Sequence, residues 1–116
     1  MPFTNASREA GALAIAALGN FISLHTGDPG TTGANEATGG APAYARKQTT
    51  WAGGAADGSV PGSQVTFDVP AGTYTHMGIW SAATGGTFLG GFALSSSTGA
   101  LPGQQNVSLT PAIAIN

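Results

Sequence analysis

The sequence contains no cysteine, few charges and no long hydrophobic run, and each absence narrows the possible functions. Without cysteine the chain has no disulfide, no thiolate metal ligand and no cysteine nucleophile. No apolar run approaches the roughly 20 residues of a membrane-spanning helix. The apolar stretch at 11–24 follows Arg8 and Glu9, whose charges cancel, so we do not expect a signal peptide there.

Charge is the scarcest property of this chain. Charged side chains make up 7% of the 116 residues, whereas roughly a quarter is typical of a soluble domain. The net charge is −2 and only Arg46 and Lys47 stand together, which argues against nucleic acid as a partner because phosphate binding depends on clustered basic residues. Interface cores are depleted in Lys, Glu and Asp. We therefore expect a subunit that packs against other proteins, with a neutral-surfaced monomer as the alternative.

The chain length suits a single domain covering residues 1–116, which begins with a predicted helix at 4–18. Thr4 or Asn5 can cap its N-terminus, and Gly19 stands where a helix commonly ends. An apolar stripe at helical spacing is predicted to pack on the sheet or on another subunit. The stripe consists of Ala10, Leu13, Ala14, Ala17 and Leu18.

From residue 20 onward the hydrophobic pattern changes to the period of two that is typical of strands. Strands are predicted at 21–25, 44–51, 64–69, 74–80, 87–94, 106–110 and 112–116. Clusters of Gly, Pro, Ser and Thr separate them at 27–43, 52–63, 70–73, 81–86 and 95–104. Short strands with such spacing indicate a mainly β fold over 20–116, an antiparallel β-sandwich or barrel-like domain with one short N-terminal helix. The glycine pair Gly90 and Gly91 predicts a bulge or bend.

The segment GDPGTTG at 27–33 contains the glycines of a phosphate-binding loop but lacks the lysine that such a loop requires. Asp28, Pro29 and Gly30 are better explained as a turn, because Asp can accept a hydrogen bond from its own downstream backbone, Pro restricts φ and Gly tolerates positive φ. His25, Asp28 and Glu36 fit no standard metal-ligand spacing. We therefore predict neither a metal nor a cofactor.

Catalysis is not expected either. No G-x-S-x-G motif accompanies the serines, although His25 and His76 could each serve as a base. We predict that the protein is not an enzyme and has no catalytic residue.

The loop at 27–43 is long for a compact domain, which suggests that it has a function. We predict that it packs against another protein, because hydroxyl and backbone groups can be buried there without stranding a charge. The predicted interface residues are Asp28, Pro29, Gly30, Thr31, Thr32, Asn35, Glu36, Arg46 and Lys47. For Arg46 we expect an ion pair with Asp68 or with a neighbouring subunit. Three aromatic residues could instead line a carbohydrate platform, or be ordinary core and rim residues. They are Tyr44, Trp51 and Trp80.

The segments SLHTGDPGTTGANEATGG, YARKQTTW and VTFDVPAGTYTHMGIWSAATGGTFLGG resemble a family of small tailed-bacteriophage virion proteins, usually labelled tail or tail-fibre proteins. The shared pattern is LHT-DPG, TGANE, YAR, an aromatic after a short threonine strand, and G-W followed by GG. The resemblance covers residues 4–94 and implies a structural role in the virion, assembled in the host bacterial cytoplasm.

The resemblance leaves two locations open. We favour a capsid decoration (cement) protein that binds the shell as a homotrimer or other homo-oligomer, because the chain lacks the length, periodicity or coiled coil of a fibre shaft. The alternative is a tail-fibre or tail-tip module, with receptor or glycan binding as its role. The expected partners are accordingly the major capsid protein or tail proteins.

Overall fold

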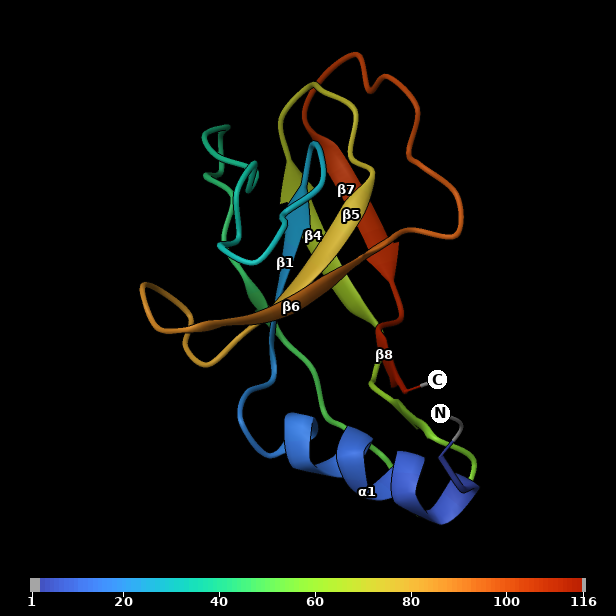
Figure 1. Cartoon of the computed structure of the whole chain (residues 1–116). Helices are drawn as coiled ribbons and strands as arrows, with labels where there is room; N and C mark the ends of the chain where they lie inside the picture. Colours follow the sequence, from blue (N-terminus) through green and yellow to red (C-terminus); the bar gives the residue numbers. More distant parts are fainter. Residues whose placement is uncertain (1–2, 116) are drawn as a thin grey trace.

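The computed structural model describes residues 3–115 and shows two layers of β-strands with a helix at one end (Figure 1). The elements are α1 (Asn5–Ala16), β1 (Phe21–His25), β2 (Lys47–Gln48), β3 (Ser59–Pro61), β4 (Val65–Val69), β5 (His76–Trp80), β6 (Phe88–Ala93), β7 (Gln105–Leu109) and β8 (Ala112–Ala114). A four-stranded antiparallel sheet has the order β2-β1-β5-β6, and β4–β7 and β3–β8 form two antiparallel ribbons. The predicted mainly β, antiparallel fold with one short helix is confirmed.

The core lies between the four-stranded sheet and the β4–β7 ribbon. β4 follows the predicted alternation, with Val65, Phe67 and Val69 buried and the residues between them more exposed. Ile22 of β1 and Ile79 of β5 are buried on the facing side of the sheet. Because both layers contribute a branched or aromatic side chain at every second position, the two inner faces form one continuous core.

The helix begins as predicted but buries a different face. Thr4 caps it, since its Oγ1 accepts a hydrogen bond from the backbone N–H of Ser7 at 3.1 Å. The predicted apolar stripe does not pack on the sheet: Leu13 is 43% and Leu18 61% exposed, whereas Glu9 and Ala12 are buried. Its packing on another subunit stays a prediction. The remaining members of the stripe, Ala10, Ala14 and Ala17, are also exposed.

Tertiary contacts explain this rotation of the helix. α1 packs against β3 and β8, and the loop at 52–58 approaches it closely enough for the backbone N–H of Gly54 to reach Glu9 Oε2 at 3.4 Å. A Cβ added at Gly53 would lie 2.6 Å from Leu13 Cδ2, so this loop fits tightly against the helix. Local apolar periodicity did not reveal this glycine-rich loop as the helix's partner.

Two strand predictions need correction. The strand predicted at 44–51 is reduced to the two residues of β2, and the predicted loop at 52–63 contains β3. β3 forms because Val60 pairs with Ile113 of β8, a contact distant in sequence that no local pattern marks. The predicted irregularity in β6 is present beside the glycine pair: Ile79 pairs with Gly90 but Trp80 pairs with Phe88, so Leu89 is the extra residue. Over residues 3–115, no helix is both long and apolar enough to cross a membrane.

The buried face of α1 can be tested with two matched alanine substitutions. Ala12→Leu should lower the free energy of unfolding by about 1–3 kcal/mol, because Ala12 is fully buried and a larger side chain must displace its neighbours. Ala14→Leu should change it by less than about 0.5 kcal/mol, because Ala14 is exposed. Urea denaturation of the two variants measures the difference, and equal effects would contradict the observed helix orientation.

Candidate functional site

The loop that follows β1 folds back over the outer face of its own sheet. Pro29 is fully buried, and a Cβ added at Gly91 of β6 would lie 2.5 Å from its Cγ. The predicted turn is confirmed: the backbone N–H of Gly30 donates to Asp28 Oδ1 at 2.8 Å, and Gly30 has φ +59°. Gly33, with φ +78°, lies so close to Trp80 that an added Cβ would be 2.4 Å from the ring. Part of the long loop therefore covers the domain itself.

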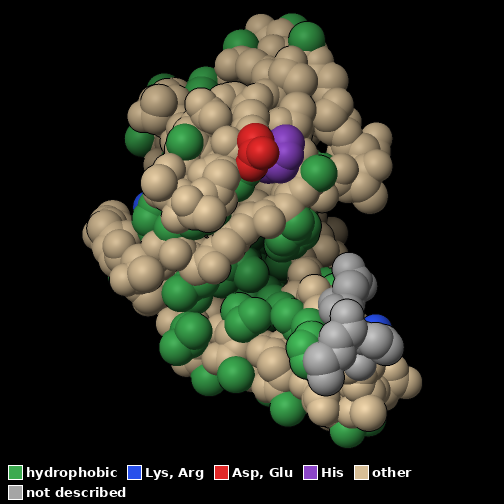
Figure 2. Space-filling model, viewed as in Figure 1, with side chains coloured by type: hydrophobic (Ala, Val, Ile, Leu, Met, Phe, Trp, Pro, Cys, Tyr) green, Lys and Arg blue, Asp and Glu red, His purple; other side chains and the backbone are tan. Residues whose placement is uncertain are grey.

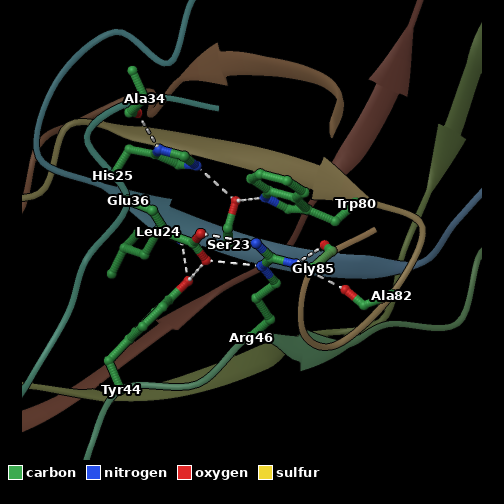
Figure 3. A network of polar contacts seen from close by, with 10 residues as sticks. All are labelled: Ser23, Leu24, His25, Ala34, Glu36, Tyr44, Arg46, Trp80, Ala82 and Gly85. Carbon is green, nitrogen blue, oxygen red and sulfur yellow. Dashed lines mark hydrogen bonds and ion pairs between the residues drawn. The ribbon is translucent and has the colours of Figure 1, made fainter. Parts of the chain in front are cut away.

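Beneath this loop, Ser23, His25 and Trp80 form one chain of hydrogen bonds (Figure 3). Trp80 Nε1 donates to Ser23 Oγ at 2.9 Å, and Ser23 Oγ lies 2.7 Å from His25 Nε2. His25 Nδ1 lies 2.8 Å from the backbone oxygen of Ala34, which can only accept. Nδ1 therefore carries the ring proton, and Nε2 accepts from the Ser23 hydroxyl.

A serine that donates to a histidine resembles the start of a hydrolytic triad, but this pair is sealed. Ser23 and His25 are both fully buried, and the ring of Phe88 packs edge-on against His25 and Trp80, with centroid distances of 6.2 and 5.1 Å. Gly78 closes the remaining side, since a Cβ there would lie 2.5 Å from Ser23 Oγ. No substrate carbonyl can approach this hydroxyl, so the pair serves the fold.

Beside it lies a second group, the Arg46 cluster, which consists of Glu36, Tyr44, Arg46 and Trp80 (Figure 3). Arg46 Nε and Nη2 donate to the two carboxylate oxygens of Glu36 at 2.9 and 3.0 Å, which is the bidentate geometry that arginine favours. The Arg46 side chain is 9% and the Glu36 side chain 21% exposed. This is therefore a largely buried ion pair.

The remaining contacts of Arg46 join two further segments to this pair. Nη1 donates to the backbone oxygens of Ala82 and Gly85 at 3.0 and 2.8 Å, so the guanidinium holds the turn between β5 and β6. Its carbon lies 3.6 Å from the Trp80 ring centroid, within the range of a cation–π contact. Each nitrogen of the Arg46 guanidinium therefore has a partner within the chain.

Tyr44 connects the cluster to the core. Its hydroxyl accepts from the backbone N–H of Leu24 at 3.0 Å and donates to Glu36 Oε2 at 2.9 Å, while its ring stacks on Phe67 at 6.1 Å. Burial, as the largest cause, raises the pKa of Tyr44 far above its usual range. The hydroxyl therefore stays protonated and remains a donor.

The predicted site residues separate into two groups. Pro29, Glu36 and Arg46 are buried or half-buried against other parts of the chain, whereas Asp28, Gly30, Thr31, Thr32, Asn35 and Lys47 are exposed. The predicted ion pair between Arg46 and Asp68 is wrong: Arg46 pairs with Glu36, and Asp68 accepts from Gln104 Nε2 at 2.6 Å. Glu36 can reach Arg46 because the loop after β1 folds back and forms a β-bridge between Glu36 and His25. The intersubunit role of these residues stays a prediction.

The three predicted ligand aromatics do not form one platform. Tyr44 and Trp80 belong to the Arg46 cluster, while Trp51 lies elsewhere and donates from Nε1 to the backbone oxygen of Gly19 at 2.9 Å. A hollow of about 300 Å³ adjoins the cluster between residues 36–46 and 83–85. Tyr44 is the aromatic among the residues lining it, and that ring is stacked on Phe67.

The histidine and acids considered as metal ligands are already bonded within the chain. Both ring nitrogens of His25 have partners, Asp28 accepts from Gly30, and the carboxylate of Glu36 is shared between Tyr44 and Arg46. Across residues 3–115, no three His, Asp or Glu side chains come together as a metal site.

Sequence reasoning missed three residues on which this arrangement depends. Ser23 links the histidine to the tryptophan, and Gly33 and Gly78 let the loop and the strands approach closely enough. Ser23 and His25 are alternate residues of β1 and therefore face the same side, but Trp80 and the side chains that Gly33 and Gly78 approach lie on other segments. Two local signals were available: this spacing, and Gly78 as a glycine inside a strand pattern, which often marks a close approach.

The residues of both hydrogen-bond networks lie in the part of the chain that matches a known protein family. The family model for podophage GP4 fiber I protein gp80 matches residues 10–115 of the chain. The chain belongs to this family. It is therefore a phage protein of the fibre type and part of the virion, which confirms the broader resemblance to phage tail and fibre proteins. No curated protein matches the chain.

The Arg46 cluster can be tested by comparing two adjacent basic residues. Arg46→Ala should lower the free energy of unfolding by about 3–5 kcal/mol, because it leaves the largely buried Glu36 carboxylate without its partner. Lys47→Ala should change it by less than about 0.5 kcal/mol, because Lys47 is exposed. Urea denaturation measures both, and equal small effects would show that the cluster does not stabilise the domain.

His25 predicts a pH dependence of stability. The pKa of His25 lies below its ordinary value of 6.5, and burial is the largest cause of this shift. His25 therefore binds a proton more readily in the unfolded state than in the folded state. This contribution to stability is complete above about pH 6.5 and is lost as the pH falls toward the folded-state pKa.

The check is urea denaturation between about pH 7.5 and pH 5, where carboxylates are mostly ionised. His25→Gln should remove most of the slope of stability with pH. A slope that survives in His25→Gln would assign the effect to another group.

Proposed function

We propose that the chain is a non-catalytic structural module of a phage tail fibre that attaches to other virion proteins through its neutral outer surface. One observation carries the proposal: the side chains best suited to catalysis or ion binding are bonded to each other within the domain. His25 and Ser23 are fully buried, and Arg46 directs its donors to Glu36, Ala82 and Gly85. Side chains that are bonded to each other in this way suit a structural role better than a reactive one.

A fibre location is favoured over capsid decoration. The sequence favours capsid decoration because the chain lacks the length or periodicity of a fibre shaft. Membership in a fiber I protein family instead supports the alternative, a location in the tail fibre. The two arguments are compatible, since a compact β domain can form the head or the base of a fibre without forming its shaft. We therefore propose a globular fibre module, with tail proteins as its partners.

The exposed tip of the loop at 27–36 is the surface we propose for contact with another virion protein. Thr31 and Thr32 are exposed, while Pro29 and Gly33 hold the two sides of the tip against the sheet. A tip that is already ordered loses little conformational entropy on binding. Its hydroxyl groups can be buried with less desolvation than charged groups.

Receptor or glycan binding stays a prediction from the sequence. Stacking on a sugar needs an accessible aromatic face, but Arg46 lies over the Trp80 ring and Phe67 stacks on Tyr44. Trp51 is half-buried, and its indole N–H is bonded to Gly19. The proposal does not depend on a sugar ligand.

Incorporation into particles tests the proposed surface. Thr31→Lys combined with Thr32→Lys should reduce the copies of this protein per purified virion at least about tenfold, because burying an unpaired charge costs several kcal/mol and each 1.4 kcal/mol is tenfold in binding. The control is Ala55→Lys with Ala56→Lys, an equally charged pair of exposed positions in another loop. Full incorporation of the threonine variant would refute the surface, and absence of the parent protein from virions would refute the function.

A further inference from the structure

The outer edge of β6 is open for pairing with another strand. β6 (Phe88–Ala93) pairs with β5 and ends the sheet, and among residues 3–115 no strand is bonded to its other side. The backbone of Leu94 donates to Thr75 at 2.8 Å, so along the alternating ladder the N–H groups of Gly91 and Ala93 point to the open side. Such an edge is a template for a further strand.

The edge lacks the usual features that prevent pairing. Natural edge strands carry Lys, Pro or inward-pointing charges, and β6 has none of these. The extra residue Leu89 disturbs only its first part, so the stretch from Gly90 to Ala93 keeps a regular register with β5.

The open edge lies beside an apolar groove. Two hollows of about 310 and 570 Å³ share Phe92 and Ala112 in their walls, and no charged residue lines either of them. Figure 2 shows hydrophobic side chains gathered in the recess between the β6 region and α1. A strand added at the β6 edge would cover the mouth of this groove.

The sequence of β6 complements itself. In an antiparallel pair, two residues that exchange N–H···O bonds stand directly opposite each other. Gly91, whose N–H points outward, can therefore stand opposite Gly91 of a second copy, with the two-fold axis between them. In that register, Phe92 faces Gly90 of the second copy and Gly90 faces Phe92 of the second copy. A Cβ at Gly90 has nothing within 4 Å, so the place for the incoming ring is empty. An aromatic residue opposite an edge glycine is a stabilising cross-strand pair.

Charge also favours a second copy as the occupant. A two-fold interface brings every side chain near its own equivalent, so a charge on this edge would meet a like charge. β6 and both hollows are uncharged, whereas the eight charged residues lie on other segments. The neutral edge is therefore electrostatically compatible with its own copy.

We propose that two copies of this chain associate through antiparallel pairing of their β6 edges, centred on Gly91. This inference rests on the proposed function, because a structural module of a fibre must join further subunits. Its test uses the purified full chain with no other phage component. Self-association can therefore fail while incorporation into virions succeeds, and the reverse.

Sedimentation equilibrium tests the proposal with two proline variants, each on an outer strand of the four-stranded sheet. At about 100 μM, where an interface with a Kd near 1 μM is almost fully formed, the parent chain should show twice its monomer mass. Ala93→Pro should show the monomer mass, because it removes an outward N–H without breaking a bond to β5. Gln48→Pro, an exposed position whose N–H points to the free side of β2, should remain dimeric.

A second pair of variants guards against misfolding of the proline variant. Gly90→Lys fills the space that Phe92 of the second copy would take and should be monomeric, whereas Gly103→Lys, where an added Cβ also meets nothing within 4 Å, should be dimeric. Unchanged circular dichroism confirms that each variant is folded. A monomeric or trimeric parent, a dimeric Gly90→Lys variant, or a monomeric Gln48→Pro variant that is folded would each overturn the proposal.

Discussion

The ion pair between Arg46 and Glu36 is the interaction on which the arrangement of the loops around the four-stranded sheet depends. It joins the loop after β1 to the segment before β2, and through Ala82 and Gly85 it also holds the turn between β5 and β6. A largely buried pair stabilises a fold only when its other donors and acceptors are satisfied. Tyr44 and the Trp80 ring complete that environment, so glycine-rich segments acquire one defined arrangement.

Close approach of backbone to side chain makes this arrangement possible. Gly33 and Gly78 leave the space that Trp80, Ser23 and His25 occupy, and any side chain at either glycine would collide with them. Abundant glycine usually raises the entropic cost of folding. Here Gly33 and Gly78 allow Ser23, His25 and Trp80 to form hydrogen bonds with each other. The same close packing buries the Ser23–His25 pair, which in an open site would resemble part of a catalytic triad.

The internal bonding of the His25 and Arg46 side chains and the low charge of the outer surface together suit a subunit of a larger assembly. Charged groups are few, and the ion pair lies in the interior, so the exposed surface offers hydroxyl, amide and backbone groups that can be buried against other proteins at modest cost. Membership in a fibre protein family agrees with this physical picture. The uncharged edge of β6 is the part of that surface with the most specific requirement, since its backbone groups can be satisfied only by another strand or by water.

The sequence by itself determined the mainly β class, the alternation of β1 and β4, the capped start of the helix and the Asp28–Gly30 turn, because each follows from contacts between residues close in the chain. Tertiary structure alone decided which face of α1 is buried, that residues 59–61 form a strand with β8, and that Arg46 meets Glu36 rather than Asp68. These depend on segments distant in sequence, whose packing overrides local periodicity. For the same reason the sequence marked Glu36, Tyr44, Arg46 and Trp80 as noteworthy, but only the fold brought them together around one guanidinium.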